Sequence, residues 1–188
     1  PPKAMKRIGI SPGPFYDPFT PSFIKSFERS FYGAGFRKGD MVLNVSSYHF
    51  VPAGTIVDDA LQGIGASFLP TGPANTELQV QVMHDLGVNG YIGTSSHLMN
   101  LIEMGERAGY NFRQDFRLEK AIITQERTPE SLRRRLEDEY RISLADFYAS
   151  APAAIALGYE CSQKSGMHVP EEVIIEVVDP ETGKQLGP

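Results

Sequence analysis

The sequence has little that would support a disulfide framework, a membrane span or a nucleic-acid interface. Its 188 residues include one cysteine, Cys161, which excludes an internal disulfide and fits a reducing, cytoplasmic compartment. No apolar run approaches the roughly 20 residues that a membrane helix needs. The formal net charge of −5 at pH 7 argues against a nucleic-acid binder, which needs a concentrated basic face. We therefore expect a globular protein with neither membrane nor nucleic acid as a partner; the oligomeric state stays open.

Two further features bear on organisation. The basic run Arg133–Arg135 is followed at once by the acidic run Glu137–Glu139, a pattern typical of a solvated helix face. The start at Pro1 is neither an initiator Met nor a signal peptide, and Asp179–Lys184 resembles a turn before a returning strand. We therefore expect the sequence to be a piece of a longer protein.

Short apolar runs alternate with segments of helical period. The runs are rich in Ile, Val or aromatic residues and are bounded by Gly, Pro or polar residues, which predicts strands. They are Arg7–Ile10, Met41–Val45, Ser67–Leu69, Gly90–Ile92, Ala121–Thr124, Ser143–Tyr148 and Val173–Val178. Apolar stripes at helical spacing lie between most of them. The stripes are Phe23/Phe27/Phe31, Leu78/Val82/Leu86, Leu98/Leu101/Ile102 and Leu132/Leu136/Tyr140.

Two helix starts carry cap signals. Thr76 and Gln79 have the spacing of a capping box, and Thr128 precedes a proline at an expected first helical position. Helices that link successive buried strands imply right-handed crossovers. The sequence thus predicts an α/β fold, with a doubly wound, mostly parallel sheet, helices on both faces and strands ordered as in the chain. We expect one domain over 1–188, with 159–188 as a candidate start of a small separate β subdomain.

Ligands bind such a sheet outside the carboxyl ends of its strands. Four loops qualify: Ser11–Thr20, Ser46–Gly54, Thr124–Thr128 and Ala149–Gly158. The first has the placement of a phosphate loop, but it begins with one glycine between two prolines that cannot donate a hydrogen bond, which favours a rigid connecting turn. His49 in the second loop is a candidate general base, although a plain polar loop is favoured because no carboxylate lies nearby in sequence.

Other catalytic patterns are weak. No G-x-S-x-G elbow surrounds a serine, so the sequence offers no hydrolase nucleophile of that kind. Cys161 and His168 supply two zinc ligands at most, with Glu160, Glu171 and Glu172 as distant candidates, whereas zinc normally takes four. We therefore predict no metal site, and in particular no stable zinc site.

Several segments, in one register over nearly the whole chain, resemble phenylacetate–coenzyme A ligases of the adenylate-forming (AMP-binding) superfamily. The segments are Leu69–Gly72, Thr76–Leu86, Gly93–Ser96, Ala145–Ala149, and Glu160-Cys161 through Gly166–His168 to Glu176–Gly183. These enzymes activate an aryl acid with ATP as an acyl adenylate and then transfer the acyl group to coenzyme A. The resemblance implies the central part of their large N-terminal domain, with ATP or AMP and coenzyme A as cofactors and a small carboxylic acid as substrate.

The resemblance implies roles for several residues. Tyr148 falls on the tyrosine that stacks on adenine, and Asp146 on the aspartate of the same signature. Glu126 falls on the acidic residue of the turn beside the nucleotide. Tyr48 falls in the loop that lines the aryl-acid pocket, which makes Tyr48, His49 and Phe50 the candidate substrate-binding residues.

The nucleotide motifs depart from the family at three places. The family's Ser/Thr/Gly-rich phosphate loop is replaced by the shorter Ser11–Asp17, and the turn Thr124–Arg127 lacks the family's glycine. Pro152 stands where the family has a glutamate that binds magnesium, the main neutraliser of charge on the α-phosphate. The family's C-terminal domain, with its catalytic lysine, lies outside this sequence.

We therefore predict that this chain alone does not adenylate an acid. Two other readings stay open: a catalytically inactive relative that binds a ligand or a partner protein, and an unrelated doubly wound domain.

Overall fold

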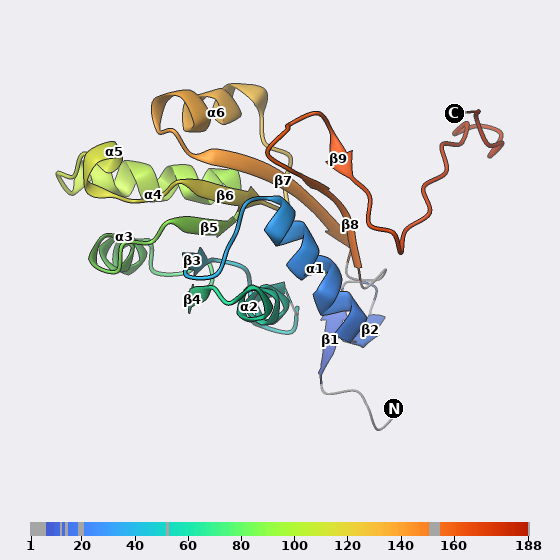
Figure 1. The fold of residues 1–188 in the computed structure, drawn as a ribbon, viewed down its shortest axis with the longest axis horizontal. Helices are drawn as coiled ribbons and strands as arrows, with labels where there is room; N and C mark the ends of the chain where they lie inside the picture. The colour runs from blue at the N-terminus through green and yellow to red at the C-terminus, as the bar shows by residue number, and fades with distance from the viewer. Residues whose placement is uncertain are drawn as a thin grey trace.

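A computed structural model describes residues 7–11, 13, 15–18, 21–51, 53–150 and 155–187. A twisted sheet lies between two layers of helices (Figure 1). The strands of this main sheet are β3 (Met41–Asn44), β4 (Ser67–Pro70), β5 (Gly90–Gly93), β6 (Lys120–Ile123), β7 (Ser143–Ser150), β8 (Ile155–Glu160) and β9 (Met167–His168). Their order is β4-β3-β5-β6-β7-β8-β9, and β3 to β7 pair in parallel while β8 and β9 are antiparallel. The predicted mostly parallel α/β sheet is confirmed.

The strand order differs from the predicted one at β4, which lies outside β3 instead of between β3 and β5. The chain winds outward from β3 to β4 and then back across the sheet to β5, β6 and β7. Right-handed crossovers in opposite directions place their helices on opposite faces, which makes the sheet doubly wound. The reversal occurs at β3, so β3 and β5 flank the topological switch point.

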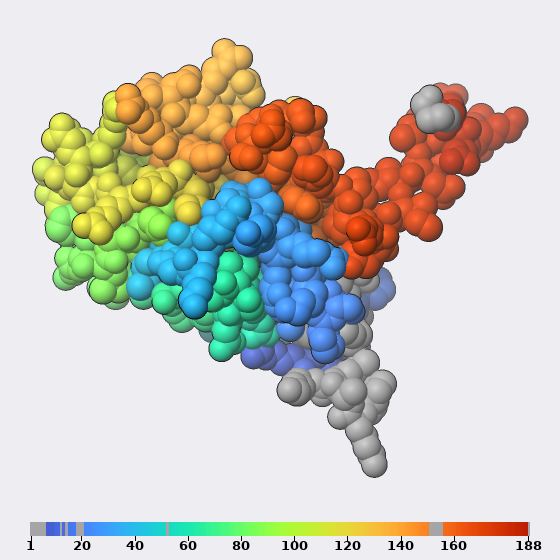
Figure 2. All heavy atoms as spheres, in the orientation of Figure 1, coloured from blue at the N-terminus to red at the C-terminus, as the bar shows by residue number. Residues whose placement is uncertain are grey.

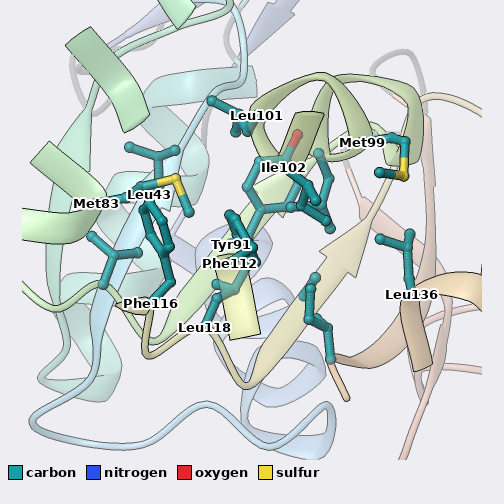
Figure 3. Close-up of a cluster of buried hydrophobic side chains, with 14 of the residues drawn as sticks. Leu43, Met83, Tyr91, Met99, Leu101, Ile102, Phe112, Phe116, Leu118 and Leu136 are labelled. Carbon is teal, nitrogen blue, oxygen red and sulfur yellow. The ribbon is translucent and has the colours of Figure 1, made fainter. Parts of the chain in front are cut away.

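The helices divide accordingly between the two faces. One face carries α1 (Pro21–Gly33) and α2 (Ala53–Ile64). The other carries α3 (Thr76–Asp85), α4 (Ser95–Arg107), α5 (Phe112–Asp115), and α6 (Glu130–Arg134), which continues into a π-helical turn, η1 (Arg135–Glu139). Successive strand residues face opposite layers: Val42 packs in the α1–α2 cluster and Leu43 in the other. Figure 3 shows Leu43, Tyr91 and the α4 residues Leu101 and Ile102 within the second cluster.

The predicted helical stripes are core-facing with one exception. Phe23, Phe27 and Phe31 on α1 are buried, and so are Leu98, Leu101 and Ile102 on α4. In the fourth stripe Leu136 is buried, while Leu132 and Tyr140 are partly buried against the same cluster.

The stripe predicted for α3 is wrong at Leu78 and Leu86, whereas its third member, Val82, is partly buried against the core. Leu78 and Leu86 are 49% and 50% exposed, whereas Val80 and Met83 are buried. The helix is rotated so that a face with fewer large apolar residues meets the sheet, and Gln79, also buried, is part of that face.

Both predicted caps are also wrong. The N-cap of α3 is Asn75, whose side chain accepts a hydrogen bond from the Leu78 N–H, and Thr76 already lies in the helix. The N-cap of α6 is Pro129, which has no side chain that can cap it. The Thr128 hydroxyl instead donates to Asp146 Oδ1 at 3.1 Å.

The two outermost predicted strands lie outside the main sheet. The first forms β1 (Ile8–Ser11), which pairs antiparallel with β2 (Phe15–Pro18) in a separate hairpin. The last, Val173–Val178, is not a strand; it makes one isolated bridge, between Val178 and Gln185, and Ile174 is 90% exposed. This C-terminal stretch extends away from the body of the molecule (Figures 1 and 2). A separate β subdomain over 159–188 stays a prediction. Within the described residues, no helix combines the length and the apolar character needed to cross a membrane.

Candidate functional site

The carboxyl ends of the parallel strands meet at one edge of the sheet, where several cavities open. After β3 the chain turns to α2 on one face, and after β5 it turns to α4 on the other face. Such a divergence opens a crevice at the strand ends. Two cavities, of about 320 Å³ and 510 Å³, lie here and share Thr124, Gln125, Phe147 and Ala149 in their linings.

The smaller of the two, called here the apolar cavity, is enclosed largely by hydrocarbon. Its apolar lining comes from α1, the loop before α2, α2 itself and the sheet: Phe23, Phe27, Phe31, Val51, Ala53, Ile56, Val57, Ile92, Phe147 and Ala149. Its polar lining comes from residues at the carboxyl ends of strands: Ser46, Ser47, Thr124, Gln125 and Ser150. Among these described lining residues none is charged, so most of the cavity suits the apolar body of a ligand, and its polar groups are neutral.

The larger one, called here the Tyr148 cavity, gathers the three predicted nucleotide residues. Glu126, Asp146 and Tyr148 line it, with Arg127 and Met167. The Tyr148 side chain is 60% exposed, and an exposed ring on a cavity wall can stack on a flat ligand. The structure thus brings together residues that are 20 or so positions apart in the sequence.

Asp146 is held by partners within the protein. Its Oδ1 accepts from the Thr128 hydroxyl, and its Oδ2 lies 2.9 Å from Nη2 of Arg133. The same Arg133 nitrogen lies 2.9 Å from Glu160 Oε2, which also accepts from the Asp146 backbone N–H. These contacts fix the carboxylate on the wall of the Tyr148 cavity.

Glu126 reaches across to the start of α4. Its Oε1 accepts from the Ser95 hydroxyl at 2.6 Å and from the Ser96 N–H at 2.8 Å. Partial burial opposes ionisation, but these hydrogen bonds outweigh it and lower the pKa of the Glu126 carboxyl. An ionised carboxylate at a helix N-terminus is also favoured by the helix dipole. Glu126 therefore fastens the turn after β6 to α4.

Gln125, in the turn after β6, has a left-handed backbone. Its φ is 71°, in the region that glycine adopts without steric cost. The turn after β6 thus has a backbone conformation that glycine would adopt more readily than Gln125. Gln125 also lines a third cavity of about 200 Å³, next to His97, so it stands where the three meet.

The three predicted acid-binding residues are not among the described residues that line these cavities. The Tyr48 hydroxyl donates to Asp58 Oδ1 and accepts from Asn44 Nδ2, both at 2.9 Å. Burial, together with Asp58, raises the pKa of Tyr48. His49 and Phe50 are exposed, and Phe50 is 82% exposed. A substrate-binding role for these three stays a prediction.

Tyr48 instead supports the start of α2. A Cβ on Gly54 would lie 2.8 Å from the Tyr48 ring, so only glycine fits there without a shift. Asn44 Nδ2 also donates to the Gly54 carbonyl. The ring thus holds the loop after β3 in place beside the apolar cavity.

His97, on α4, lines the third cavity. The sequence alone gave no sign of a role for this residue. Its Nε2 lies 2.9 Å from Gln79 Oε1, and the Gln79 amide donates to Thr71 Oγ1 and the Gly72 carbonyl. Burial lowers the pKa of His97, which favours the neutral imidazole. This network connects α3, α4 and the turn after β4.

Parts of the predicted site lie elsewhere. The loop Ser11–Thr20, which has the placement of a phosphate loop but was expected to be a connecting turn, falls in the hairpin β1–β2, so it does not follow a strand of the main sheet. Pro12, Pro14 and Pro152 lie outside the described residues.

Cys161 and His168 are neighbours in the folded chain, with His168 Nε2 3.1 Å from Cys161 Sγ. Within the described residues, no group of three His, Cys, Asp or Glu side chains is placed to hold a metal ion. The absence of a stable zinc site stays a prediction, which metal analysis of the purified protein would test.

The sequence did not identify the apolar cavity or its determinants. The α1 stripe signalled a core face, and Phe23, Phe27 and Phe31 do pack in the core, but they also line the cavity. Their spacing gives no sign that a space lies beside them. Ser46 carried no signal beyond its place after a strand.

Known proteins are similar to this chain in sequence. No protein-family model matches it. A phenylacetate-coenzyme A ligase of Pseudomonas putida is 30% identical over 161 residues, 84% of this chain and 36% of that protein. A phenylacetate-coenzyme A ligase of Thermus thermophilus is 26% identical over 167 residues, 87% of this chain and 37% of that protein. The chain thus spans little more than a third of these curated relatives.

Solved structures share the fold at lower identity. A 2-hydroxyisobutyryl-CoA ligase in complex with 2-HIB-AMP and CoA matches 97% of this chain and 42% of its own, with a TM-score of 0.85 and 18% identity. An anthranilate CoA ligase in complex with anthranoyl-AMP matches 96% of this chain and 34% of its own, with a TM-score of 0.74 and 15% identity. At these identities the likeness shows the fold.

Proposed function

Because this chain is similar in sequence to phenylacetate–coenzyme A ligases and has the fold of adenylate-forming acyl-CoA ligases, we propose that it is the acid- and nucleotide-binding part of an AMP-forming acyl-CoA ligase-like protein. The acid is one with an aryl or similarly apolar body. The nucleotide is ATP or AMP, and coenzyme A is the acyl acceptor of the whole protein.

The observation that carries this proposal is the contact between two unlike cavities. The apolar cavity and the Tyr148 cavity share Thr124, Gln125, Phe147 and Ala149. Adenylation joins a carboxylate to the α-phosphate of ATP, so acid and nucleotide must lie side by side with their reacting groups adjacent. A cavity for an apolar acid beside a cavity with an exposed tyrosine supports that arrangement.

The proposed roles follow the linings. Tyr148 stacks on adenine, and Asp146, held by Arg133 and Thr128, offers its remaining acceptor capacity to the base. Glu126 is a positioning residue, since its carboxylate already binds Ser95 and Ser96. The apolar body of the acid packs against the α1 phenylalanines.

Magnesium does not fit the described residues. The Asp146 and Glu126 carboxylates are engaged by Arg133 and by the α4 N-terminus, and no third carboxylate joins them in a cluster among the described residues. We therefore assign no step to a metal ion.

A second candidate function is that of an inactive relative that binds the same ligands. It is favoured by Pro152 at the family's magnesium position and by Gln125 in a turn that has lost its glycine. Both candidates need the two cavities to bind ligand, and they differ in whether the whole protein forms an acyl adenylate.

Equilibrium binding tests what the two candidates share. We expect phenylacetate and AMP each to bind this chain, and phenylacetyl-sulfamoyl-adenosine, a stable analogue of the acyl adenylate, to displace both. An analogue that displaced only one of the two would contradict adjacent sites, and a chain that bound neither would contradict the proposed function.

A further inference from the structure

Ser46, directly after β3, carries a buried hydroxyl without a partner. The residue is 2% exposed, and Ser46 Oγ has no hydrogen-bond partner among the described residues. Its backbone N–H is satisfied by Asn44 Oδ1 at 3.0 Å, so only the hydroxyl is left over. A buried polar group without a partner is unfavourable and uncommon, and it calls for an explanation such as a missing ligand.

The position of Ser46 offers that explanation, because the residue lines the apolar cavity and rotation about its Cα–Cβ bond can turn the buried hydroxyl towards a ligand there. The cavity has two ends of different character. Its phenylalanine wall comes from α1, and its hydroxyl and amide groups come from residues at or just after the ends of β3, β6 and β7. A ligand with an apolar body and a hydrogen-bond acceptor at one end fits that division.

We propose that Ser46 is a substrate-binding residue whose hydroxyl donates a hydrogen bond to the carboxylate of the acid in the apolar cavity. The inference rests on the proposed function and deepens it, since it places the carboxyl end of the acid. The body of the acid points to Phe23, Phe27 and Phe31, and its carboxylate points to the strand ends, where the Tyr148 cavity begins.

The donor must be neutral in this cavity, because none of the described residues that line it is charged. A hydroxyl that donates to a carboxylate forms a charge-assisted bond, which is shorter and stronger than one between neutral groups. A neutral donor also leaves the carboxylate unpaired by any cation, and hence available for reaction with a phosphate.

Ser46→Ala tests the inference with two probes, phenylacetate and toluene. Toluene has the aromatic ring but no acceptor. Without ligand, we expect the variant to be as stable as the parent or slightly more stable, because the deleted hydroxyl has no partner. We expect phenylacetate to bind about tenfold more weakly, as for one lost charge-assisted hydrogen bond, and toluene to bind within about twofold of the parent.

Ser30→Ala is the matched control. Ser30 is also fully buried, but its hydroxyl donates to the Ser26 carbonyl at 2.8 Å within α1, and it is not a lining residue of the apolar cavity. We expect that variant to be less stable than the parent with an unchanged ratio of the two affinities.

The outcomes separate this inference from the proposed function. If Ser46→Ala leaves the ratio of phenylacetate to toluene affinity unchanged, the role of Ser46 is wrong and the proposed function stands. If the parent binds neither probe, the apolar cavity is not an acid site and both fail.

Discussion

Nη2 of Arg133 lies 2.9 Å from Asp146 Oδ2 and 2.9 Å from Glu160 Oε2, so one cation joins two neighbouring antiparallel strands. The three side chains are 14%, 22% and 16% exposed. Burial alone would lower the pKa of Arg133, but Glu160 and Asp146 outweigh it and raise that pKa further. Because Asp146 lies on the wall of the Tyr148 cavity, this ion triad connects the stability of β7 and β8 to the shape of the candidate site.

We predict that Arg133→Met destabilises the protein by about 2–3 kcal/mol. The substitution leaves two partly buried carboxylates facing each other without a cation. Chemical denaturation gives the free energy of unfolding. The control is Arg134→Met, which removes an ion pair with Glu130. The Arg134 and Glu130 side chains are 71% and 67% exposed, so we expect the unfolding free energy to fall by less than about 0.5 kcal/mol. Equal losses in the two variants would contradict a special role for Arg133.

A second ion pair, at the amino ends of β3 and β6, predicts a pH dependence of stability. Asp40 lies 2.9 Å from Nζ of Lys120 and accepts further hydrogen bonds from Arg37 N and Asn89 Nδ2. Burial opposes ionisation, but these bonds outweigh it and hold the pKa of Asp40 below its ordinary value. The pKa is therefore lower in the folded state than in the unfolded chain.

The sign of the effect follows from linkage. The stabilisation is fully present above the unfolded value, roughly pH 4, and is lost as the pH falls through the folded pKa, because the unfolded chain takes up the proton first. We expect Asp40→Asn to cost about 2 kcal/mol at neutral pH and to flatten the fall in unfolding free energy below roughly pH 4. Asp138→Asn, at an exposed position on η1, should keep the parent's slope. A parent-like slope in Asp40→Asn would show that other groups dominate the acid limb.

The sequence predicted the parts of the fold that depend on local pattern. The short apolar runs of β3 to β7 indicate strands, and the helical spacing of the stripes on α1 and α4 indicates helices. The order of β3 and β4 does not follow from local pattern, because a right-handed crossover can lead to either side of a strand. The α3 stripe misled because Leu78 and Leu86 are apolar but exposed, whereas the buried Gln79 is satisfied by Thr71 and Gly72.

In the candidate site, too, some features could be predicted from the sequence and others could not. The resemblance predicted Tyr148, Asp146 and Glu126 as nucleotide-binding residues, and the fold places all three on one cavity. The two ion pairs of Arg133 depend on contacts between α6, β7 and β8. The lack of a partner for the Ser46 hydroxyl depends on how the chain packs after β3. Spacing in the sequence reveals neither. The resemblance pointed to the loop around Tyr48 as an acid-binding loop, which stays a prediction, and the fold directs the Tyr48 hydroxyl towards Asn44 and Asp58.

The left-handed backbone at Gln125 predicts a stabilising substitution. With φ at 71°, a side chain there is strained by about 1 kcal/mol relative to glycine. We expect Gln125→Gly to raise the unfolding free energy by up to about 1 kcal/mol. Gln163→Gly is the control, because Gln163 lies in an exposed turn without a positive φ, and there we expect no gain. A loss of stability in Gln125→Gly would show that its side chain makes contacts that outweigh the strain.

We predict that this chain alone does not catalyse exchange of pyrophosphate into ATP in the presence of phenylacetate. By the resemblance, Pro152 stands where phenylacetate–coenzyme A ligases have a magnesium-binding glutamate, and the hairpin β1–β2 stands where they have a glycine-rich phosphate loop. Charge on the α-phosphate therefore lacks its usual neutralisers. The exchange assay decides this, with acid-free reactions as the blank. Acid-dependent exchange above that blank would contradict the prediction.

The exposed Tyr148 ring predicts how the nucleotide binds. Stacking of a base on an aromatic side chain contributes about 1–3 kcal/mol, so we expect Tyr148→Ala to weaken adenosine and AMP binding by roughly 5- to 100-fold. Stacking needs neither a phosphate loop nor a metal ion, so AMP and adenosine should bind the parent about as well as Mg-ATP does.

Tyr32→Ala is the control, because Tyr32 on α1 is also exposed, at 56%, but lies against Arg37 and is not a lining residue of either cavity. Calorimetric titration of the parent and both variants with adenosine, AMP and Mg-ATP measures these affinities. A clear preference of the parent for Mg-ATP would mean that the triphosphate is recognised after all, and an unchanged affinity in Tyr148→Ala would mean that adenine does not stack on this ring.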